Sequence, residues 1–306
     1  MARKNRVTLW GKVINEPMIS QDPVTLELKK ASFFMMVMNQ DRDNGIDEGG
    51  VMYSQPFVYT ENPEMIKEIS TWKQGDLVDV RGVLTTVDAK RAAICTNCNN
   101  KIVKDGEVTL ITPLFIEKRY SGADLTEKES AEIIRNHREV SNLVELSGSL
   151  CADPREQKKA KFYGDAISRM SYKGLALYQL AVNRHFFIQS DNPSTKTDYP
   201  HMVSIGENAE EDLVRLHKDS RISVEGMIAT RTFRKTITCP YCGEKFDRDE
   251  KVTEVLVYNT EYHANFNEVE GTGHEARENK DKQKLNEAYE KLGIATDSET
   301  SENNAE

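Results

Sequence analysis

Two pairs of cysteines carry the clearest chemistry in this sequence. Cys95 and Cys98 are separated by two residues, and so are Cys239 and Cys242. Thiolates at this spacing can each supply half of a tetrahedral zinc site, and structural zinc takes four protein ligands. Because each pair supplies only two, we predict that both pairs close a single site that holds one structural Zn²⁺ per chain.

Other roles for these cysteines remain open. Each pair could be a separate half-site, could share a metal with another chain, or could be a loop that has lost its metal. A redox role is a further alternative, but redox Cys-x-x-Cys motifs normally cap a helix in a βαβ unit. Here each pair falls between two predicted strands. If the zinc is shared, its loss should free the two halves of the chain from each other without unfolding them.

The strands that must position the cysteines occur twice. Gly82 precedes Cys95 by thirteen residues, and Gly226 precedes Cys239 by thirteen, so strand, glycine and cysteine pair recur at an offset of 144. The opening Asn-x-Val-x-Leu-x-Gly run recurs as well, at an offset of 137. Such self-similarity indicates an internal duplication.

Each copy has the strand order of an OB-fold. Four or five short strands are predicted, and a small helix falls between the third and fourth, as with Glu64 to Trp72 in the first copy. This is the order of the OB-fold, a Greek-key β-barrel that grips oligonucleotides or oligosaccharides. The predicted fold class is therefore mainly β, with two tandem OB-fold domains and a zinc-ribbon-like knuckle from each.

The duplication predicts four parts of the chain. These are OB-fold domain 1 at 1–119, a helical linker at 120–141, OB-fold domain 2 at 142–268, and an acidic, largely disordered tail at 269–306. In the linker, Thr126 and Glu129 have the spacing of a capping box, which predicts a helix that ends near Arg138. A frayed helix is expected within the tail at 275–291.

Charge and hydropathy limit the environment more than the function. The net charge is -9, but the tail holds 10 acidic and 5 basic residues, so it carries -5 of this total. The two copies are then nearly neutral, and their basic residues can still line one groove. No stretch approaches the ~20 apolar residues that a bilayer crossing needs. We expect a soluble, cytoplasmic protein without membrane contact.

The strand at 26–39 is apolar on both of its faces, which is unusual in an antiparallel sheet with one solvated side. One face is interpreted as core, together with its counterparts in the second copy: Phe34, Met36 and Met38, with Tyr178, Leu180 and Val182. The opposite face has no evident partner: Phe33, Met35 and Val37. It is interpreted as a binding or oligomer surface, and a homodimer with four OB-folds is predicted from it.

Four motifs carry a resemblance to a known family. They are Asn5-x-Val-x-Leu-x-Gly11 with Pro17, Asn142-x-Val-x-Leu-x-Gly148 with Pro154, Leu180-Ala-Val-Asn-Arg184, and Lys73-x-Gly75-Asp-x-Val-x-Val-x-Gly82. In these motifs the chain resembles the bacterial and phage single-stranded DNA-binding proteins. The resemblance implies OB-folds that bind single-stranded DNA without strict sequence preference, in the replication, recombination or repair of a bacterial host cell.

The resemblance also implies where bases stack. The family's aromatic positions fall on Tyr53, Tyr59, Tyr199 and Phe233, and Phe186 follows the motif that ends at Arg184. Stacking platforms need cations nearby. The predicted cations are Arg184 in that motif, Lys90 and Arg91 in the first copy, and Arg231, Arg234 and Lys235 in the second.

The chain departs from this family in two respects. Ordinary members carry one OB domain per chain and no Cys-x-x-Cys pair. The family's acidic tail ends in Pro-Phe, whereas this sequence ends Glu302-Asn-Asn-Ala-Glu306. The acidic tail still predicts contacts with replication or recombination proteins.

The alternative to a nucleic-acid-binding protein is an enzyme. Zinc deaminases combine His-x-Glu with Pro-Cys-x-x-Cys. His137-Arg-Glu139 matches the first part, but neither cysteine pair follows a proline. No phosphate-binding loop or nucleophile elbow occurs, so no catalytic residue is predicted. The rival to a DNA-binding protein is a zinc-bearing OB-fold scaffold subunit of a replication or recombination complex, and oligonucleotide binding separates the two.

Overall fold

A computed structural model describes residues 4–39, 53–157, 175–184 and 197–268 of the 306-residue chain. The chain divides into two compact units, Met1–Phe266 and Asn267–Glu306. Both repeats and the segment between them lie in the first unit. The predicted tail helix and disordered end lie outside the described residues, as does Phe186.

The first copy contains seven strands and one helix among its described residues. They are β1 (Asn5–Val13), β2 (Met18–Gln21), β3 (Leu28–Met38), β4 (Tyr53–Ser54), β5 (Phe57–Thr60), α1 (Pro63–Ile69), β6 (Leu77–Ile94) and β7 (Lys101–Tyr120). Strand β1 pairs with both β3 and β6, and the parallel contact between β5 and β7 joins the third strand to the last. These pairings close the strands into an OB barrel.

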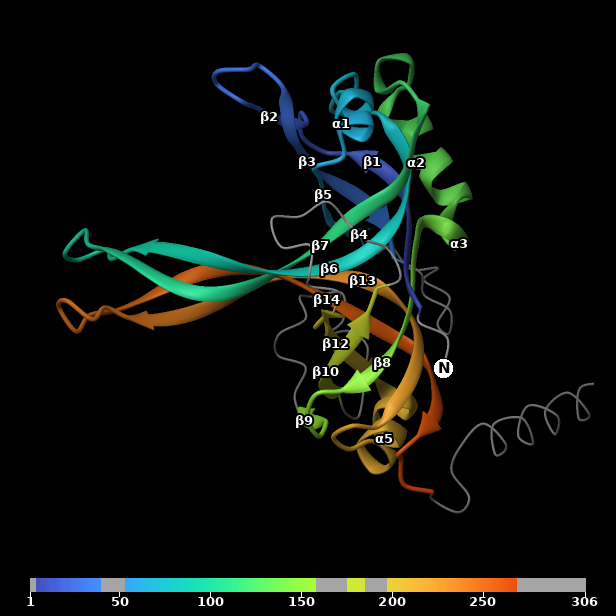
Figure 1. Ribbon diagram of the computed structural model, residues 1–306, viewed down its shortest axis with the longest axis vertical. Helices are drawn as coiled ribbons and strands as arrows, with labels where there is room; N and C mark the ends of the chain where they lie inside the picture. Colours follow the sequence, from blue (N-terminus) through green and yellow to red (C-terminus); the bar gives the residue numbers. More distant parts are fainter. Residues whose placement is uncertain (1–3, 40–52, 158–174, 185–196, 269–306) are drawn as a thin grey trace, which may run out of the picture. The chain divides into compact units, whose positions relative to one another are not determined.

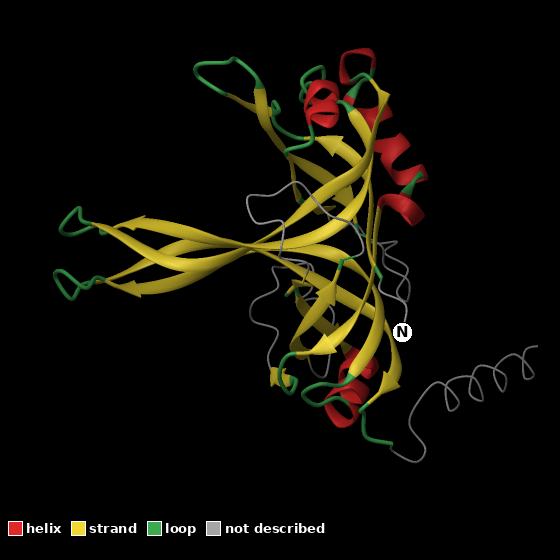
Figure 2. Cartoon of the chain, in the orientation of Figure 1, coloured by secondary structure: helices red, strands yellow, loops and turns green. Residues whose placement is uncertain are grey.

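The second copy repeats this order after a helical connection. The connection contains η1 (Gly122–Asp124), α2 (Glu127–Asn136) and α3 (Arg138–Ser141). The copy itself contains β8 (Asn142–Leu150), β9 (Arg155–Gln157), β10 (Leu175–Asn183), β11 (Thr197–Asp198), β12 (His201–Ile205), α5 (Gly206–Arg215), β13 (Arg221–Thr238) and β14 (Lys245–Ala264). The fold is mainly β, with two tandem OB-folds, as predicted (Figure 2).

The two copies join through their first strands. Strand β1 runs antiparallel to β8, and Val7 lies opposite Val144, its own counterpart at the offset of 137. Such self-matching register places an approximate twofold axis at this pair, as in an isologous dimer. The two barrels therefore share one sheet of 14 described strands and are not separate domains joined only by a linker.

One hydrophobic cluster runs through both barrels. It contains Val7, Leu9 and Val80 of the first copy and Val144, Leu146 and Val224 of the second, all at or near zero exposure. The alternation of buried and exposed positions along β1 and β8 follows the period of two that the sequence shows. Trp72 packs in this cluster, with its ring in a T-shaped contact with that of Phe33 at 5.3 Å between centroids, so it is a core residue.

The assignment of faces on the strand at 26–39 was wrong for Phe34 and Met36, whereas Met38 and the second-copy residues are buried as predicted, namely Tyr178, Leu180 and Val182. Phe33, Met35 and Val37 are completely buried, whereas Phe34 and Met36 are only half-buried. Val37 lies opposite Gly11 just as Val182 lies opposite Gly148, so the offset in this strand is 145 and not 144. A one-residue slip exchanges the two faces of a strand. The surface from which the homodimer was predicted is thus part of the core.

The linker is a packed element of the first barrel. Thr126 and Glu129 form the predicted capping box at the start of α2. Ile134 of α2 packs with Trp10, Met38 and Leu77 of the barrel, and the ring of His137 stacks on Trp10 at 4.2 Å between centroids. The position equivalent to Trp10 in the second copy is a serine, so only the first copy has an apolar outer face for a helix to cover.

Long arms extend from both barrels. The β6–β7 hairpin pairs continuously from Leu77 to Ile94, and the β13–β14 hairpin from Arg221 to Thr238. The two arms run side by side away from the barrels and carry the cysteines at their tips (Figure 1). No helix in the described part of the chain is long and apolar enough to cross a membrane.

Each arm begins at a glycine that allows close backbone approach. A Cβ on Gly82 would lie 2.2 Å from the carbonyl oxygen of Thr112, and one on Gly226 would lie 2.2 Å from that of Leu256. The register shifts at both glycines, as at a β-bulge. Bulges bend a strand, so these glycines permit the bend between barrel and arm.

We predict that Gly82→Ala destabilises the fold by about 1–3 kcal/mol, because the added methyl group must displace a backbone carbonyl. Gly106→Ala is the matched control, since a Cβ there would meet only the flexible Arg91 side chain, at 3.2 Å. Urea unfolding followed by circular dichroism measures both. Equal midpoints for the two variants would contradict the argument.

Candidate metal centre and nucleic-acid interface

The four cysteines meet at the tips of the two arms. The sulfur of Cys95 lies 3.7 Å from that of Cys242, and the sulfur of Cys98 lies 3.6 Å from that of Cys239. All four sulfurs lie within 4.8 Å of one another. A tetrahedral zinc with Zn–S bonds of about 2.3 Å requires sulfurs about 3.8 Å apart. The cluster can therefore hold a metal ion, and its spacing is compatible with zinc.

Both knuckle loops have the same backbone conformation. Asn99 and Gly243 occupy equivalent positions and both have positive φ, 57° and 75°. Each loop is closed by an amide that donates to the carbonyl of its first cysteine, at 3.0 Å for Asn99 and 2.9 Å for Gly243. Asparagine tolerates this conformation better than most residues, which explains how the first knuckle forms this turn without a glycine.

A small apolar core lies beneath the cysteines. Ala93 and Ile102 of the first arm pack against Ile237 and Phe246 of the second. Farther down, Arg91 forms an ion pair with Glu250 at 3.0 Å, and the guanidinium of Arg248 donates to the carbonyl of Ala92. The arms thus contact each other along their length and not only through the cysteines.

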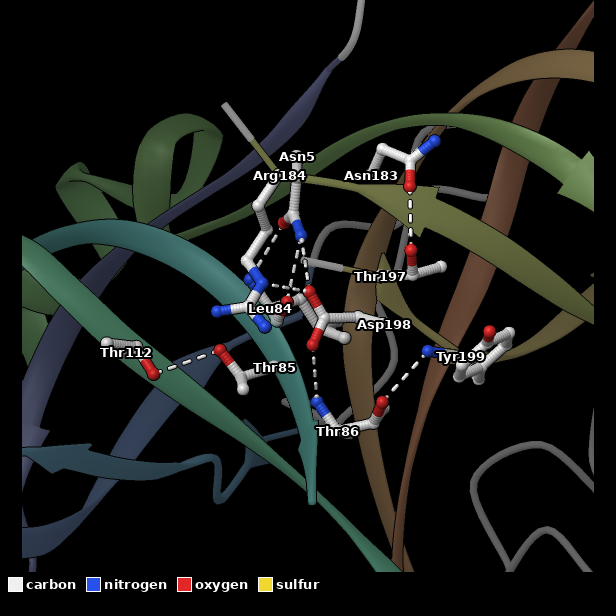
Figure 3. Close-up of polar contacts among 10 residues, drawn as sticks. All are labelled: Asn5, Leu84, Thr85, Thr86, Thr112, Asn183, Arg184, Thr197, Asp198 and Tyr199. Carbon is white, nitrogen blue, oxygen red and sulfur yellow. Dashed lines mark hydrogen bonds and ion pairs between the residues drawn. The ribbon is translucent and has the colours of Figure 1, made fainter. Parts of the chain in front are cut away.

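The base of each arm is fixed to the other copy. The amide of Thr86 on β6 donates to the buried carboxylate of Asp198 at 3.0 Å, and the amide of Tyr199 donates to the Thr86 hydroxyl at 2.8 Å (Figure 3). Asp198 also forms a 2.6 Å ion pair with Arg184. We call these residues, Thr86, Arg184 and Asp198, the charged lock.

A neutral lock occupies the equivalent place on the opposite side. The amide of Gln55 donates to the Thr230 hydroxyl at 2.7 Å, and the amide of Thr230 donates to the Ser54 hydroxyl at 3.4 Å. Ser54 lies opposite Val37 as Asp198 lies opposite Val182, so serine and aspartate are counterparts. The duplication has kept the backbone contact while the two locks differ in charge.

Burial controls the ionisation of the charged lock. Desolvation raises the pKa of Asp198 to about 6, while the Thr86 amide and Arg184 lower it. The carboxyl is mainly ionised at neutral pH. Because its folded pKa exceeds the value of 3.8 for an unperturbed aspartate, its contribution to stability is complete below about pH 3.8 and is lost as the pH rises through about 6.

These contacts correct the expected role of the metal. We expected metal loss to free the two copies from each other. The β1–β8 ladder and both locks join the barrels without any cysteine. A metal at the tips would therefore hold the arms together, and the barrels are joined by contacts that do not involve it.

An aromatic face lies on the first barrel. Phe34 of β3 and Phe57 of β5 are cross-strand neighbours, their ring centroids are 4.9 Å apart, and both are half-buried. Tyr59 is on the same face of β5, with the amine of Lys30 5.9 Å from its ring centroid. The amine of Lys251, from the second copy's arm, lies 5.6 Å from the centroid of the Phe34 ring. We call this set of residues the aromatic groove.

The predicted stacking residues are dispersed. Tyr53 and Tyr199 are exposed, at 37% and 44%. They do not occupy equivalent positions in the two copies: the strand registers make Thr197 the equivalent of Tyr53 and Gln55 the equivalent of Tyr199. Tyr59 is half-buried, and its hydroxyl bonds to Glu61. Phe233 lies on β13 opposite Glu250, so its backbone is on the second arm.

The predicted cations differ in how firmly they are paired. Lys90 is exposed on the first arm. Arg231 binds both oxygens of Glu254 at 2.8 Å, Lys235 lies 3.6 Å from Glu250, and Arg234 lies 3.5 Å from Asp249 at the surface. Arg91 and Arg184 belong to the contacts between the copies described above. The side chain of Arg184 is only 4% exposed, so its position favours a structural role.

A cavity of about 320 Å³ lies between the two arms, from the apolar core beneath the cysteines to Thr109 and Thr253. Five cations and three carboxylates line it, together with His201. The cations are Arg91, Lys104, Lys235, Arg248 and Lys251, and the carboxylates are Asp105, Glu107 and Glu250. Lys251 belongs to both the cavity and the aromatic groove, so the two are adjacent.

Sequence reasoning missed Phe34, Phe57 and Lys251. Phe34 was assigned to the core because of the one-residue slip, and Lys251 belongs to the other copy, 217 residues away from Phe34 along the chain. Phe57 had a usable signal, since it alternates with Tyr59 on a predicted strand.

A serine–histidine contact in the second copy is the feature closest to a catalytic arrangement among the described residues. The Ser223 hydroxyl lies 2.7 Å from Nε2 of His263, but Glu261 lies 3.8 Å from the same nitrogen. In a nucleophilic triad the acid orients the opposite ring nitrogen. This geometry therefore does not support nucleophilic catalysis.

Comparison with solved structures identifies similar folds. The wild-type single-stranded DNA-binding protein from Thermus aquaticus matches with a TM-score of 0.52 and 16% identity, over 89% of this chain and 98% of that one. A deletion variant of the same Thermus protein matches with a TM-score of 0.52 and 17% identity, over 88% and 100%.

The similarity to the Thermus protein establishes the fold alone. A Plasmodium falciparum single-stranded DNA-binding protein in complex with single-stranded DNA matches at 18% identity over 38% of this chain and 94% of that one, with a TM-score of 0.28. No protein-family model matches the sequence. No curated protein matches it either.

We predict that Arg184→Gln destabilises the fold by about 3–5 kcal/mol, because it leaves the buried Asp198 carboxylate without its cation. Arg234→Gln, which removes an exposed ion pair, should cost at most about 1 kcal/mol. Chemical denaturation measures both.

The neutral lock of the first copy suggests a second variant that should recover part of the stability lost in Arg184→Gln. The counterparts of Arg184 and Asp198 are Asn39 and Ser54, so the double variant Arg184→Asn, Asp198→Ser converts the charged lock to the neutral type. It should be more stable than Arg184→Gln. If the double variant is less stable than Arg184→Gln, an unpaired buried charge is not the main cost of losing Arg184.

Proposed function

We propose that this protein binds single-stranded DNA without strict sequence preference and protects it during replication, recombination or repair. The aromatic groove is the observation that carries the proposal. It presents three half-buried rings side by side on the barrel strands, with lysine amines 5.9 Å and 5.6 Å from two of them. Bases of any type can stack on such rings, and each stacked base contributes ~1–3 kcal/mol.

The cations supply the second component of binding. Phosphates bind through charge, and this part of the affinity does not depend on sequence. Lys90, Arg231, Arg234 and Lys235 remain proposed contacts, as do Tyr53, Tyr199 and Phe233. The mixed charge of the cavity between the arms supports a path for a flexible strand that touches scattered cations, rather than a rigid duplex that needs a continuous basic surface.

The metal in this proposal is one structural Zn²⁺ per chain, held by Cys95, Cys98, Cys239 and Cys242. The sulfur spacing and the two matched knuckle loops support it. When bound, the zinc would cross-link the arms. Zinc chemistry at a fully thiolate-ligated site is structural, since no ligand position is left for water.

A zinc-bearing scaffold subunit with weak nucleic-acid affinity remains the second candidate. The ion-paired state of Arg91 and Arg231 favours it, because those cations already have carboxylate partners. Tight binding of oligonucleotides by the isolated protein would reject it.

We predict that oligo-dT quenches the intrinsic fluorescence of the protein, and that log K falls with log salt by about 0.7 per phosphate contacted. Tyr59→Ala should weaken binding by ~1–3 kcal/mol, the contribution of one stacked base. Tyr241→Ala is the control, because this exposed ring lies in the knuckle between Cys239 and Cys242. Tighter binding to duplex than to dT would refute the function.

For the metal, we predict one zinc per chain by elemental analysis. The double variant Cys239→Ser, Cys242→Ser should lose all of it, because two thiolates cannot complete the site. The arms should then become sensitive to trypsin near Lys245 and Arg248, while the far-UV spectrum is retained. Cys151→Ser, outside the cluster, should keep the metal. Two zincs per chain, or zinc retained in the double variant, would exclude a shared site.

A further inference from the structure

The two barrels present different chemistry on equivalent faces. The strand registers make Gln179 the counterpart of Phe34, and His201 the counterpart of Phe57. Tyr59 corresponds in the same way to Val203, which is buried in an aliphatic cluster with Leu175 and Met227. The second copy thus has one small, polar imidazole ring, that of His201, and no phenyl or phenol ring at the three positions that form the aromatic groove.

The arms extend this difference to charge. Each arm crosses to the other barrel, so the residue that faces a groove comes from the other copy. Lys251 of the second arm faces the aromatic groove, with its amine 5.6 Å from the Phe34 centroid. The equivalent residue of the first arm, at the offset of 144, is Glu107.

The position of Glu107 follows from its neighbours. It lines the same cavity as His201, the counterpart of Phe57, and its charge raises the pKa values of Asp198 and Cys151 in the second copy. Where the aromatic groove receives a cation from its neighbour, the equivalent position on the first arm is a carboxylate, in a cavity that also contains Lys104 and Lys251. A carboxylate repels the phosphates of a single strand.

We propose that the two copies bind a single strand unequally: the first copy forms the principal site, which Lys251 of the second copy completes, and Glu107 weakens the site on the second copy. This inference rests on the proposed function. It assigns base stacking to Phe34 and Phe57. It also makes the preference of the strand for the first copy depend on Lys251 and Glu107, which occupy equivalent positions on the two arms.

The first groove also contains an acid, which limits the role of Lys30. Glu61 lies 3.6 Å from the Lys30 amine and accepts a hydrogen bond from the Tyr59 hydroxyl. Lys30 is therefore partly neutralised within its own copy. Lys251 is the cation that the other copy supplies to the aromatic groove.

The experiment uses the full chain and a short oligo-dT of about 8 nucleotides, within the site size of one OB-fold. Phe34→Leu and Phe57→Leu keep apolar bulk on the strand but remove the ring, and each should weaken binding by roughly 5- to 150-fold, the loss of one stacked base. Gln179→Ala and His201→Ala, at the same positions of the second copy, should change affinity less than about twofold, because the proposal places no stacked base there.

The charge changes test the contribution of the arms. Lys251→Glu should weaken binding, because it replaces an amine that attracts phosphates by a carboxylate, whereas Glu107→Lys should strengthen it. Lys251→Met removes the charge and keeps the packing on Phe34, so an effect of this variant assigns the loss to charge.

The outcomes distinguish the two proposals. Failure of the unaltered protein to bind dT would refute the proposed function itself. Tight binding by the unaltered protein with equal losses for the Phe34 and Gln179 variants, or a loss on Glu107→Lys, would leave the function standing and overturn the inequality of the two copies.

Discussion

The antiparallel pairing of β1 with β8 is the contact on which the rest of the structure depends. Because Val7 lies opposite its own counterpart, Val144, the two barrels are related by an approximate twofold axis. Each arm leaves its barrel at a bulged glycine and passes the other barrel, where Thr86 and Thr230 make equivalent backbone contacts. The meeting of the four cysteines is a consequence of this pairing and does not cause it.

Covalent linkage of the two copies permits them to diverge. In a homodimer both sides of a twofold contact must carry the same residues. Here the charged lock contains Asp198 and Arg184, whereas the neutral lock has Ser54 in place of the aspartate. The outer face of the first barrel carries Trp10 beneath a helix, and the equivalent position in the second copy is a serine. The shared backbone contacts preserve the fold, while side chains at equivalent places have acquired different chemistry.

The sequence was sufficient for the parts that repeat with strict periodicity. Gly82 and Cys95 recur together at one offset, and this spacing predicted the duplication, while the order of strands and helix in each copy predicted the OB-fold. It was insufficient where the offset changes: the offset is 145 between β3 and β10 but 144 at the arms, and this difference of one led us to exchange the core and solvent faces of β3. It was also silent about contacts such as Lys251 with Phe34, which depend on how one copy crosses the other. The domain boundaries and DNA contacts remain predictions.

The position of the cysteines limits what a metal can stabilise. A two-stranded hairpin alone is marginally stable in water, and the core between the arms contains few apolar side chains beyond Ile102, Ile237 and Phe246. A cross-link at the tips would therefore contribute mainly to the arms. Lys251 lies on the same strand as the second knuckle but beside the barrel, where β14 remains paired with β13 from Thr232 down to Arg221. The aromatic groove should thus depend less on the metal than the arm tips do.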